Sequence, residues 1–248
     1  MNRFFVDRKQ IHEDTIEIVG KDVKHIKDVL RLRIKDNLEI ASEGRCYLCE
    51  IVLIESKRVV VKILDVWEGE NEPPIHINLF QGIAKGDKMD LIIQKCTEVG
   101  AKEIFPVFTN RTVVKIKDRD KENKKIDRWN LIAEEAAKQS KRDIIPVVRN
   151  AIDFEDMVEI LKDEEHIIVP YEMESSKGIK EVLKGITGKR INVVIGPEGG
   201  FEEYEIDMLR TIGAQVVTLG PRILRTETAG IVTVAMILYE LGDLGVML

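Results

Sequence analysis

The feature that most constrains this chain is a change of pattern near residue 75, after which short apolar runs alternate with helical spacing. The apolar runs predict strands at Ile75 to Ile83, Glu103 to Phe108, His166 to Val169, Ile191 to Ile195 and Gln215 to Leu219. Apolar residues three and four apart predict helices at Gly86 to Val99, Trp129 to Ala137, Ser176 to Ile186, Tyr204 to Ile212 and Thr226 to Leu241. Nearly continuous apolar strands are typical of a parallel sheet covered on both faces, so the pattern predicts an α/β fold.

The first 72 residues follow a different pattern, which is mostly β. Four strands are predicted, at Thr15 to Val19, Asn37 to Ala41, Tyr47 to Ile54 and Val59 to Val66. One helix interrupts them, with Val23, Ile26, Val29 and Leu30 on its apolar face. Such short strands predict a small barrel. Because Glu68 to Pro74 is polar and carries Gly and two prolines, we expect two domains, 1–72 and 73–248.

Composition narrows the class of protein further. Hydrophobic residues make up 44% and charged residues 33%, which is typical of a globular protein. The longest uncharged stretch, Thr228 to Tyr239, is shorter than the roughly 20 apolar residues of a membrane span, so no membrane segment is expected. The N-terminus shows no signal-peptide pattern, and three scattered cysteines make no disulfide framework. These features predict a cytoplasmic protein with reduced thiols.

Cys46 and Cys49 form an isolated C-x-x-C. A structural zinc site needs a second pair of ligands at similar spacing, and the sequence offers none. Both cysteines fall in a predicted strand, where a separation of three residues places their sulfurs on opposite faces. We therefore expect ordinary buried thiols and no metal.

Basic residues gather in two segments of an otherwise acidic chain with net charge −6. Six basic and two acidic residues lie between Lys21 and Lys35, and twelve basic and seven acidic residues lie between Arg111 and Arg149. Affinity for phosphate depends on local charge rather than on the total. The segments are either solvated faces or contacts to a polyanion, and the sequence leaves both interpretations open.

Three loops stand where ligands bind in open parallel sheets, just beyond the carboxyl ends of predicted strands. They are Val169 to Glu172, Gly196 to Phe201, and Leu219 to Ala229. The second loop is neither a dinucleotide-binding nor a Walker A motif and lacks a lysine, so nucleoside triphosphates are not expected. Its glycines let backbone approach a ligand closely. Glu198 either accepts hydrogen bonds from the N-terminus of the next helix or faces a cationic ligand such as a sulfonium.

The third loop combines apolar side chains with backbone donors and acceptors, which suits an adenine ring. Arg222 and Arg225 lie three residues apart there, and ion pairs to Glu227, Glu198 or Glu202 are as reasonable for them as a functional role. Thr226 is predicted to be the N-cap of the last helix.

Taken together, these loops resemble the signature motifs of the ribosomal RNA small subunit methyltransferase E family, SPOUT-class enzymes that methylate N3 of one uridine in 16S rRNA. Further segments that are similar to the family are Arg3 to Phe5, His25, Val29 to Arg33, Lys85 to Lys95 and Glu134 to Ser140. The resemblance runs nearly from end to end. One departure is Gly230, where the family more often has a small side chain.

The resemblance implies the architecture and the ligand. It implies a C-terminal trefoil-knotted (SPOUT) α/β domain with a parallel sheet, preceded by a small PUA-like β-barrel domain that binds RNA. It also implies that the knot loops hold S-adenosylmethionine (SAM) in a bent form. The enzyme is expected to be a homodimer, with each site near the subunit interface.

The loops, the basic segments and the resemblance together give candidate residues for three roles. The candidates for SAM binding are Val169, Pro170, Ile195, Gly196, Pro197, Gly199, Gly200, Leu219, Gly220, Arg222, Ile223, Leu224, Thr226 and Ala229. Arg225 is the candidate that stabilises the deprotonated uracil, and Glu198 is a possible general base that would need a raised pKa. The candidates for RNA phosphate contacts are Arg3, Lys24, Arg31, Arg33, Lys138 and Arg142; each is equally compatible with plain surface charge.

Two alternatives remain open at this stage. One is a SPOUT methyltransferase that acts on another RNA, such as tRNA. The other is a non-catalytic RNA-binding assembly factor that does not bind SAM. The sequence does not give the target nucleotide, the general base, the geometry of the dimer, or whether the substrate is naked rRNA or an assembled subunit.

Overall fold

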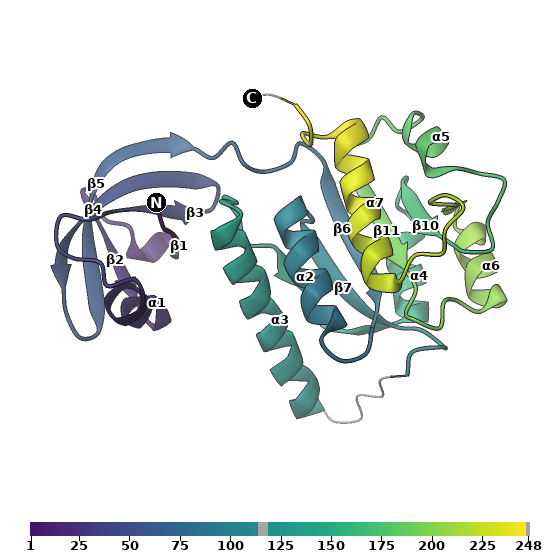
Figure 1. The fold of residues 1–248 in the computed structure, drawn as a ribbon, viewed down its shortest axis with the longest axis horizontal. Coiled ribbons are helices and arrows are strands. Elements are labelled where there is room, and N and C mark those ends of the chain that lie inside the picture. The colour runs from purple at the N-terminus through teal and green to yellow at the C-terminus, as the bar shows by residue number, and fades with distance from the viewer. Residues whose placement is uncertain (114–118, 247–248) are drawn as a thin grey trace. The chain divides into compact units, whose positions relative to one another are not determined.

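A computed structural model of the chain describes residues 1–113 and 119–246 (Figure 1). The chain divides into two compact units, one formed by residues 1–72 and 137–145 and the other by residues 73–136 and 146–248. Part of the predicted basic segment between Arg111 and Arg149, residues 114–118, lies outside the described residues. None of the helices in the described part of the chain is long and apolar enough to cross a membrane.

The first unit is built on a five-stranded sheet in the order β1-β3-β4-β5-β2. Its strands are β1 (Arg3–Phe5), β2 (Thr15–Val19), β3 (Asn37–Ser42), β4 (Arg45–Ile54) and β5 (Arg58–Glu68). β1 pairs in parallel with β3, and the other pairs are antiparallel. Alternate residues point inward, so Ile16, Ile18, Val59 and Val61 form part of one core, as period-two patterning predicts.

The predicted helix of this unit is present but is not a regular α-helix. One α-helical turn, α1 (Lys21–Lys24), continues as a π-helix, η2 (His25–Val29). A separate short 3-10 turn, η1 (Arg8–Gln10), lies between β1 and β2. The wider π turn changes which side chains face inward. Val23 and Ile26 are buried as predicted, but Val29 is 66% exposed, so its predicted place on the apolar face is wrong.

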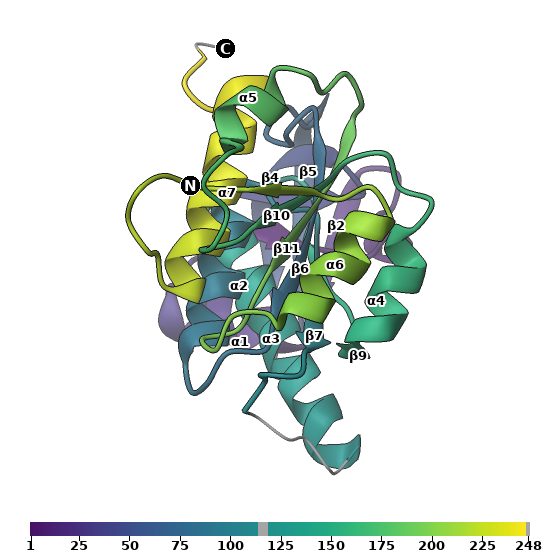
Figure 2. The same cartoon turned by 90° about the vertical axis from the view of Figure 1, so that its right-hand side faces the viewer.

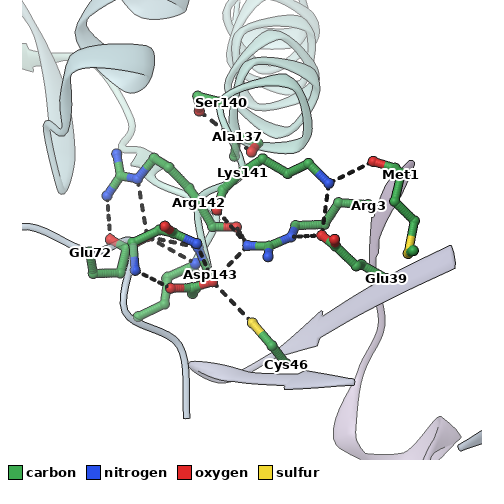
Figure 3. Close-up of polar contacts among 12 residues, drawn as sticks. Met1, Arg3, Glu39, Cys46, Glu72, Ala137, Ser140, Lys141, Arg142 and Asp143 are labelled. Atoms are coloured by element: carbon green, nitrogen blue, oxygen red, sulfur yellow. Dashed lines mark hydrogen bonds and ion pairs between the residues drawn. The ribbon is translucent and has the colours of Figure 1, made fainter. Parts of the chain in front are cut away.

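Residues 137–145 belong to the first unit and form a cluster of polar contacts with residues near its N-terminus and with Glu72 (Figure 3). Arg3 donates to Glu39 (Nε to Oε2, 3.1 Å) and to Asp143 (Nη1 to Oδ1, 2.6 Å). The Cys46 thiol donates to the same Asp143 oxygen at 3.0 Å, and burial raises the pKa of this thiol to about 12. Arg142 pairs with Glu72 at 2.5 Å. The cluster therefore joins the first strand to a segment about 140 positions later in the chain.

The second unit contains a seven-stranded parallel sheet in the order β12-β10-β11-β6-β7-β8, with β9 also paired to β7. The strands are β6 (His76–Gly82), β7 (Glu103–Phe108), β8 (Val147–Val148), β9 (Ile152–Asp153), β10 (Ile167–Pro170), β11 (Arg190–Ile195) and β12 (Gln215–Val217). The helices are α2 (Lys88–Val99), α3 (Arg119–Gln139), α4 (Phe154–Leu161), α5 (Ile179–Leu183), α6 (Glu203–Thr211) and α7 (Thr226–Leu241). The predicted α/β class with a parallel sheet is confirmed.

Helices cover both faces of this sheet, as the continuous apolar strands predict. Figure 2 shows α2 and α7 on one side of the strands and α4 and α6 on the other. Along β11, Val193 and Ile195 belong to the core under α2 and α7, whereas Val194 belongs to the core under α4 and α6. Because both faces are buried, the strand cannot show hydrophobic–polar alternation.

Sequence patterns missed β8, β9 and α4. The two strands have only two residues each, which is too short for periodicity to register. α4 did carry a signal, because Phe154, Met157 and Leu161 are buried at i, i+3 and i+7. Cys46, Cys49 and Cys96 are buried free thiols, as expected, and the described residues contain no group of three metal-ligating side chains.

Candidate functional site

The three predicted loops follow β10, β11 and β12, which are adjacent parallel strands, so their carboxyl ends open at one edge of the sheet. Two cavities of about 530 Å³ each lie there. The residues that line both cavities are Pro170, Glu172, Ile223, Leu224 and Ala229. The loops therefore form one continuous cleft, large enough for a small organic cofactor.

Nearly all predicted cofactor residues line this cleft. One cavity is lined by Leu219, Gly220 and Arg222, and the other by Ile195, Gly196, Pro197, Gly199, Gly200 and Thr226. Val169 differs, because it is fully buried in the core under α4 and α6. Side chains alternate along a strand, so the Pro170 side chain faces the cleft while the Val169 side chain points into the core, and the structure does not bring the Val169 side chain into the lining.

The glycine-rich loop depends on one backbone conformation that favours glycine. Gly200 has a φ of +69°, and a Cβ at this position would lie 2.7 Å from Oε1 of Glu172. Glu172 lies in the loop after β10 and lines both cavities. A side chain at position 200 would therefore be strained and would displace this carboxylate from the cleft.

Glu198 is held by residues at the start of α2, not by the helix that follows its own loop. Its Oε1 accepts a hydrogen bond from the Lys85 N–H at 3.0 Å and lies 3.1 Å from Nζ of Lys88. Partial burial acts to raise the pKa of Glu198, but the hydrogen bonds from Lys85 and its own backbone, with the Lys88 charge, outweigh it and lower that pKa. A lowered pKa is opposite to the raised pKa that a general-base role of Glu198 requires.

Lys88 is a cleft residue that the sequence analysis did not single out. Its Nζ lies 3.1 Å from Glu198 and 3.6 Å from Oε2 of Glu227, and the residue lines the cleft. It thus bridges the glycine-rich loop and the first turn of α7. The one feature of the sequence that points to Lys88 is its place in the segment Lys85 to Lys95, which is similar to the family.

The predicted alternative for the arginines was ion pairing with Glu227, Glu198 or Glu202. In the structure Glu198 and Glu227 contact Lys88, and Glu202 contacts Nε of Arg111 at 2.9 Å. Arg111 also donates to the Gly199 carbonyl at 2.9 Å, so it supports the glycine-rich loop from outside. Arg222 and Arg225 are exposed and line the cleft.

Thr226 is the first residue of α7, and Arg225 occupies the N-cap position that was predicted for it. The reason is that the Thr226 hydroxyl is engaged elsewhere. It donates to the Gly196 carbonyl at 2.5 Å and accepts from Nε2 of Gln81 at 2.9 Å. The predicted N-cap role of Thr226 is therefore wrong.

The six candidates for RNA contacts separate into two groups. Lys24, Arg31 and Arg33 are exposed, so their proposed role is compatible with the structure. Arg3, Lys138 and Arg142 are only 6%, 9% and 3% exposed, and they pair with Asp143, Asp22 and Glu72. A buried, paired cation offers little to a phosphate, so the structure gives these three no support as RNA contacts, and their role in RNA binding stays a prediction.

Comparisons with known proteins identify the domains of the chain. A family model described as an RNA methyltransferase domain matches residues 71–238, and one described as an RNA methyltransferase PUA domain matches residues 18–64. These matches show that the chain is an RNA methyltransferase with a PUA-like domain.

More specific relatives are found across the whole length. The chain is 36% identical to ribosomal RNA small subunit methyltransferase E of Bacillus subtilis, over 97% of each chain. The crystal structure of a ribosomal RNA small subunit methyltransferase E from Neisseria gonorrhoeae bound to SAM is 30% identical, with a TM-score of 0.86, covering 98% of this chain and 99% of that one. A methyltransferase from Legionella pneumophila with bound SAM is 31% identical, with a TM-score of 0.88, over 98% of each chain. This chain belongs to the ribosomal RNA small subunit methyltransferase E family, and the predicted family membership is confirmed.

Proposed function

We propose that this protein is a SAM-dependent methyltransferase that methylates N3 of a specific uridine in 16S rRNA of the small ribosomal subunit. The observation that carries the proposal is the convergence of three predicted loops on one cleft. Two solved structures of relatives support the proposal, because both contain bound SAM and align with nearly the whole chain. We place the reaction in the cytoplasm, where small subunits are assembled.

The cleft residues fit SAM in chemical type. Backbone groups of the loop after β12 and the apolar surface of Ile223, Leu224 and Ala229 suit an adenosine moiety, which needs an apolar slot and a few directional hydrogen bonds. The carboxylates of Glu172 and Glu174 suit its cationic groups. Bound SAM supplies a methyl group that its sulfonium already activates, so the reaction needs no metal.

The protein's task is to expose the uracil, align N3 and stabilise the charge that develops on the base. The N3–methyl bond forms as the sulfonium–methyl bond breaks, and the N3 proton leaves to solvent or to a base. Arg225 lines the cleft with an exposed guanidinium, and we assign it to stabilising the uracilate. Glu198 is not assigned as the base, because its pKa is lowered.

We also propose a trefoil knot in the second unit and a homodimer. The strand order, in which β11 lies between β10 and β6 while β12 returns to the far side of β10, is compatible with such threading. α7 has apolar residues on its outer side, with Tyr239 72% exposed and Val232 and Ala235 half-buried. A helix that is apolar on nearly all sides needs cover from a partner. Light scattering would test the dimer.

The first unit is proposed to close as a PUA-like barrel that contacts RNA through Lys24, Arg31 and Arg33. They come from α1 and the loop after η2, and all three are exposed. The match of a PUA-domain model to residues 18–64 supports the assignment.

The test is methyl transfer from labelled SAM to small ribosomal subunits that lack the modification, with naked 16S rRNA and tRNA in parallel. Reverse transcription maps the product, because a methyl on N3 blocks base pairing. Label at one uridine of 16S rRNA supports the proposal, and the two rRNA samples show whether assembly matters. Label in tRNA alone contradicts the substrate, and failure both to bind SAM and to transfer a methyl group favours a non-catalytic assembly factor.

A further inference from the structure

Gln81 is the last buried polar residue of β6, and neither cavity includes it in its lining. It is completely inaccessible to solvent. Its Nε2 donates to the Gly82 carbonyl at 3.0 Å and to Oγ1 of Thr226 at 2.9 Å. Because burial of an amide is unfavourable unless its groups are paired, these two bonds fix where the side chain lies.

The chemistry of the neighbours fixes the orientation of this amide. The single proton of the Thr226 hydroxyl goes to the Gly196 carbonyl at 2.5 Å, so only lone pairs of that hydroxyl face Gln81. The Gly82 carbonyl is also an acceptor. The amide must therefore present Nε2 to both, and Oε1 is left without a hydrogen-bond partner among the described residues. Leaving the buried Oε1 unpaired is unfavourable in free energy, and the two hydrogen bonds that Nε2 donates offset this penalty.

These bonds close a ring at the carboxyl edge of the sheet. Gly82 packs against the glycine-rich loop so closely that a Cβ there would lie 2.5 Å from the Pro197 nitrogen. Gly196 precedes Pro197 in that loop and accepts from Thr226, which opens α7. The end of β6, the loop after β11 and the start of α7 are thereby tied to each other. Gly196, Pro197 and Thr226 all line the cleft.

We propose that Gln81 is a positioning residue for the cofactor. Through Thr226 it fixes the spacing between the glycine-rich loop and the first turn of α7, and so holds the cleft in the geometry that binds SAM. A cleft already held in its bound geometry loses less conformational freedom on binding. This proposal rests on the proposed function, since it takes SAM as the ligand of the cleft.

The test measures the Kd for SAM by titration calorimetry, together with thermal unfolding, on the full-length protein. Gln81→Met keeps the shape of the side chain and removes both hydrogen bonds. We expect the Kd to rise about tenfold, which corresponds to about 1.4 kcal/mol. Thr226→Val should raise it similarly, and Thr226→Ser, which keeps the hydroxyl, should restore it. The Gln81→Met/Thr226→Val double variant should bind no more weakly than the weaker single variant, because both break one chain of bonds.

The matched control is Thr233→Val. Thr233 is also fully buried on α7, and its hydroxyl has no hydrogen-bond partner among the described residues. This variant should leave the Kd unchanged. If the Gln81 and Thr226 variants unfold at lower temperature but bind SAM as the wild type does, the residue is only structural and the proposal is overturned. If Gln81→Met does not fold, the Val and Ser variants at position 226 decide alone. Wild-type protein that fails to bind SAM contradicts the proposed function instead.

Discussion

Two arginines of the first unit differ from two arginines of the second unit in burial and in their partners. In the first unit, Arg3 and Arg142 are buried and each is held by a carboxylate. At the cleft of the second unit, Arg222 and Arg225 are exposed, while the nearby carboxylates pair with Lys88 and Arg111. The difference teaches that the partner of a basic residue, more than its place in a motif, decides whether it supports the fold or is available to a substrate.

The strongest test of this comparison removes a buried partner. Asp143→Ala removes one of the two carboxylates that pair with the buried Arg3 guanidinium, and with it the acceptor of the Cys46 thiol, so we expect the free energy of unfolding to fall by about 3 kcal/mol. Chemical denaturation measures the loss. The control is Arg45→Met, which breaks the exposed pair with Glu68 and should change stability little. Equal losses in both variants would remove the distinction between buried and exposed pairs.

The reverse behaviour is expected at the cleft. Arg225→Met should lower kcat for methyl transfer by about 10²–10³-fold, by analogy with the loss of one donor to a developing anion. The Kd for SAM and the free energy of unfolding should stay near those of the wild type. Arg190→Met, at the exposed start of β11 and away from the carboxyl edge of the sheet, is the control and should retain wild-type kcat. Unchanged turnover in the Arg225 variant would end its catalytic assignment.

A pH experiment sharpens the comparison inside the first unit. Partial burial acts to raise the pKa of Glu39, but hydrogen bonds and charges from Lys141 and Arg3 outweigh it and hold that pKa below 4.5. A lowered pKa stabilises the fold at pH above 4.5, and this contribution disappears as the pH falls through the lowered value. Glu39→Gln should therefore be less stable than the wild type at neutral pH, and the gap should close in acid. A gap that does not depend on pH would contradict this cause.

The smallest expected effect concerns the exposed basic residues of the first unit. If Lys24, Arg31 and Arg33 contact phosphates, neutralising each should reduce the slope of log affinity against log salt by about one unit or less. Binding of 16S rRNA measured at several salt concentrations checks this. Lys162→Ala, an exposed residue at the end of α4, should leave the slope unchanged. An unaltered slope in the triple variant would assign these residues to plain surface charge.

Local patterns in the sequence were enough for the parallel sheet and for the position of the cleft. Apolar runs such as Ile191 to Ile195 identify strands, and a rule about carboxyl ends then gives the loops. The ion-pair partners of individual side chains could not be predicted in the same way. Glu198 contacts Lys88, 110 positions earlier in the chain, and Arg3 contacts Asp143, 140 positions later. Periodicity does not reveal such pairings, so the ion-pair partners of Arg3, Lys138, Arg142 and Glu198 could not be predicted from the sequence.

The return of residues 137–145 to the first unit has a consequence for synthesis of the chain. Arg3 cannot meet Asp143 until about 140 further residues have been made, and contacts so distant in sequence form slowly because a long loop must close. Until then the nascent first unit lacks the Asp143 partner of Arg3 and the Lys138 partner of Asp22. Completion of this unit is therefore a late event on the ribosome, delayed until the first part of the second unit has emerged from the exit tunnel.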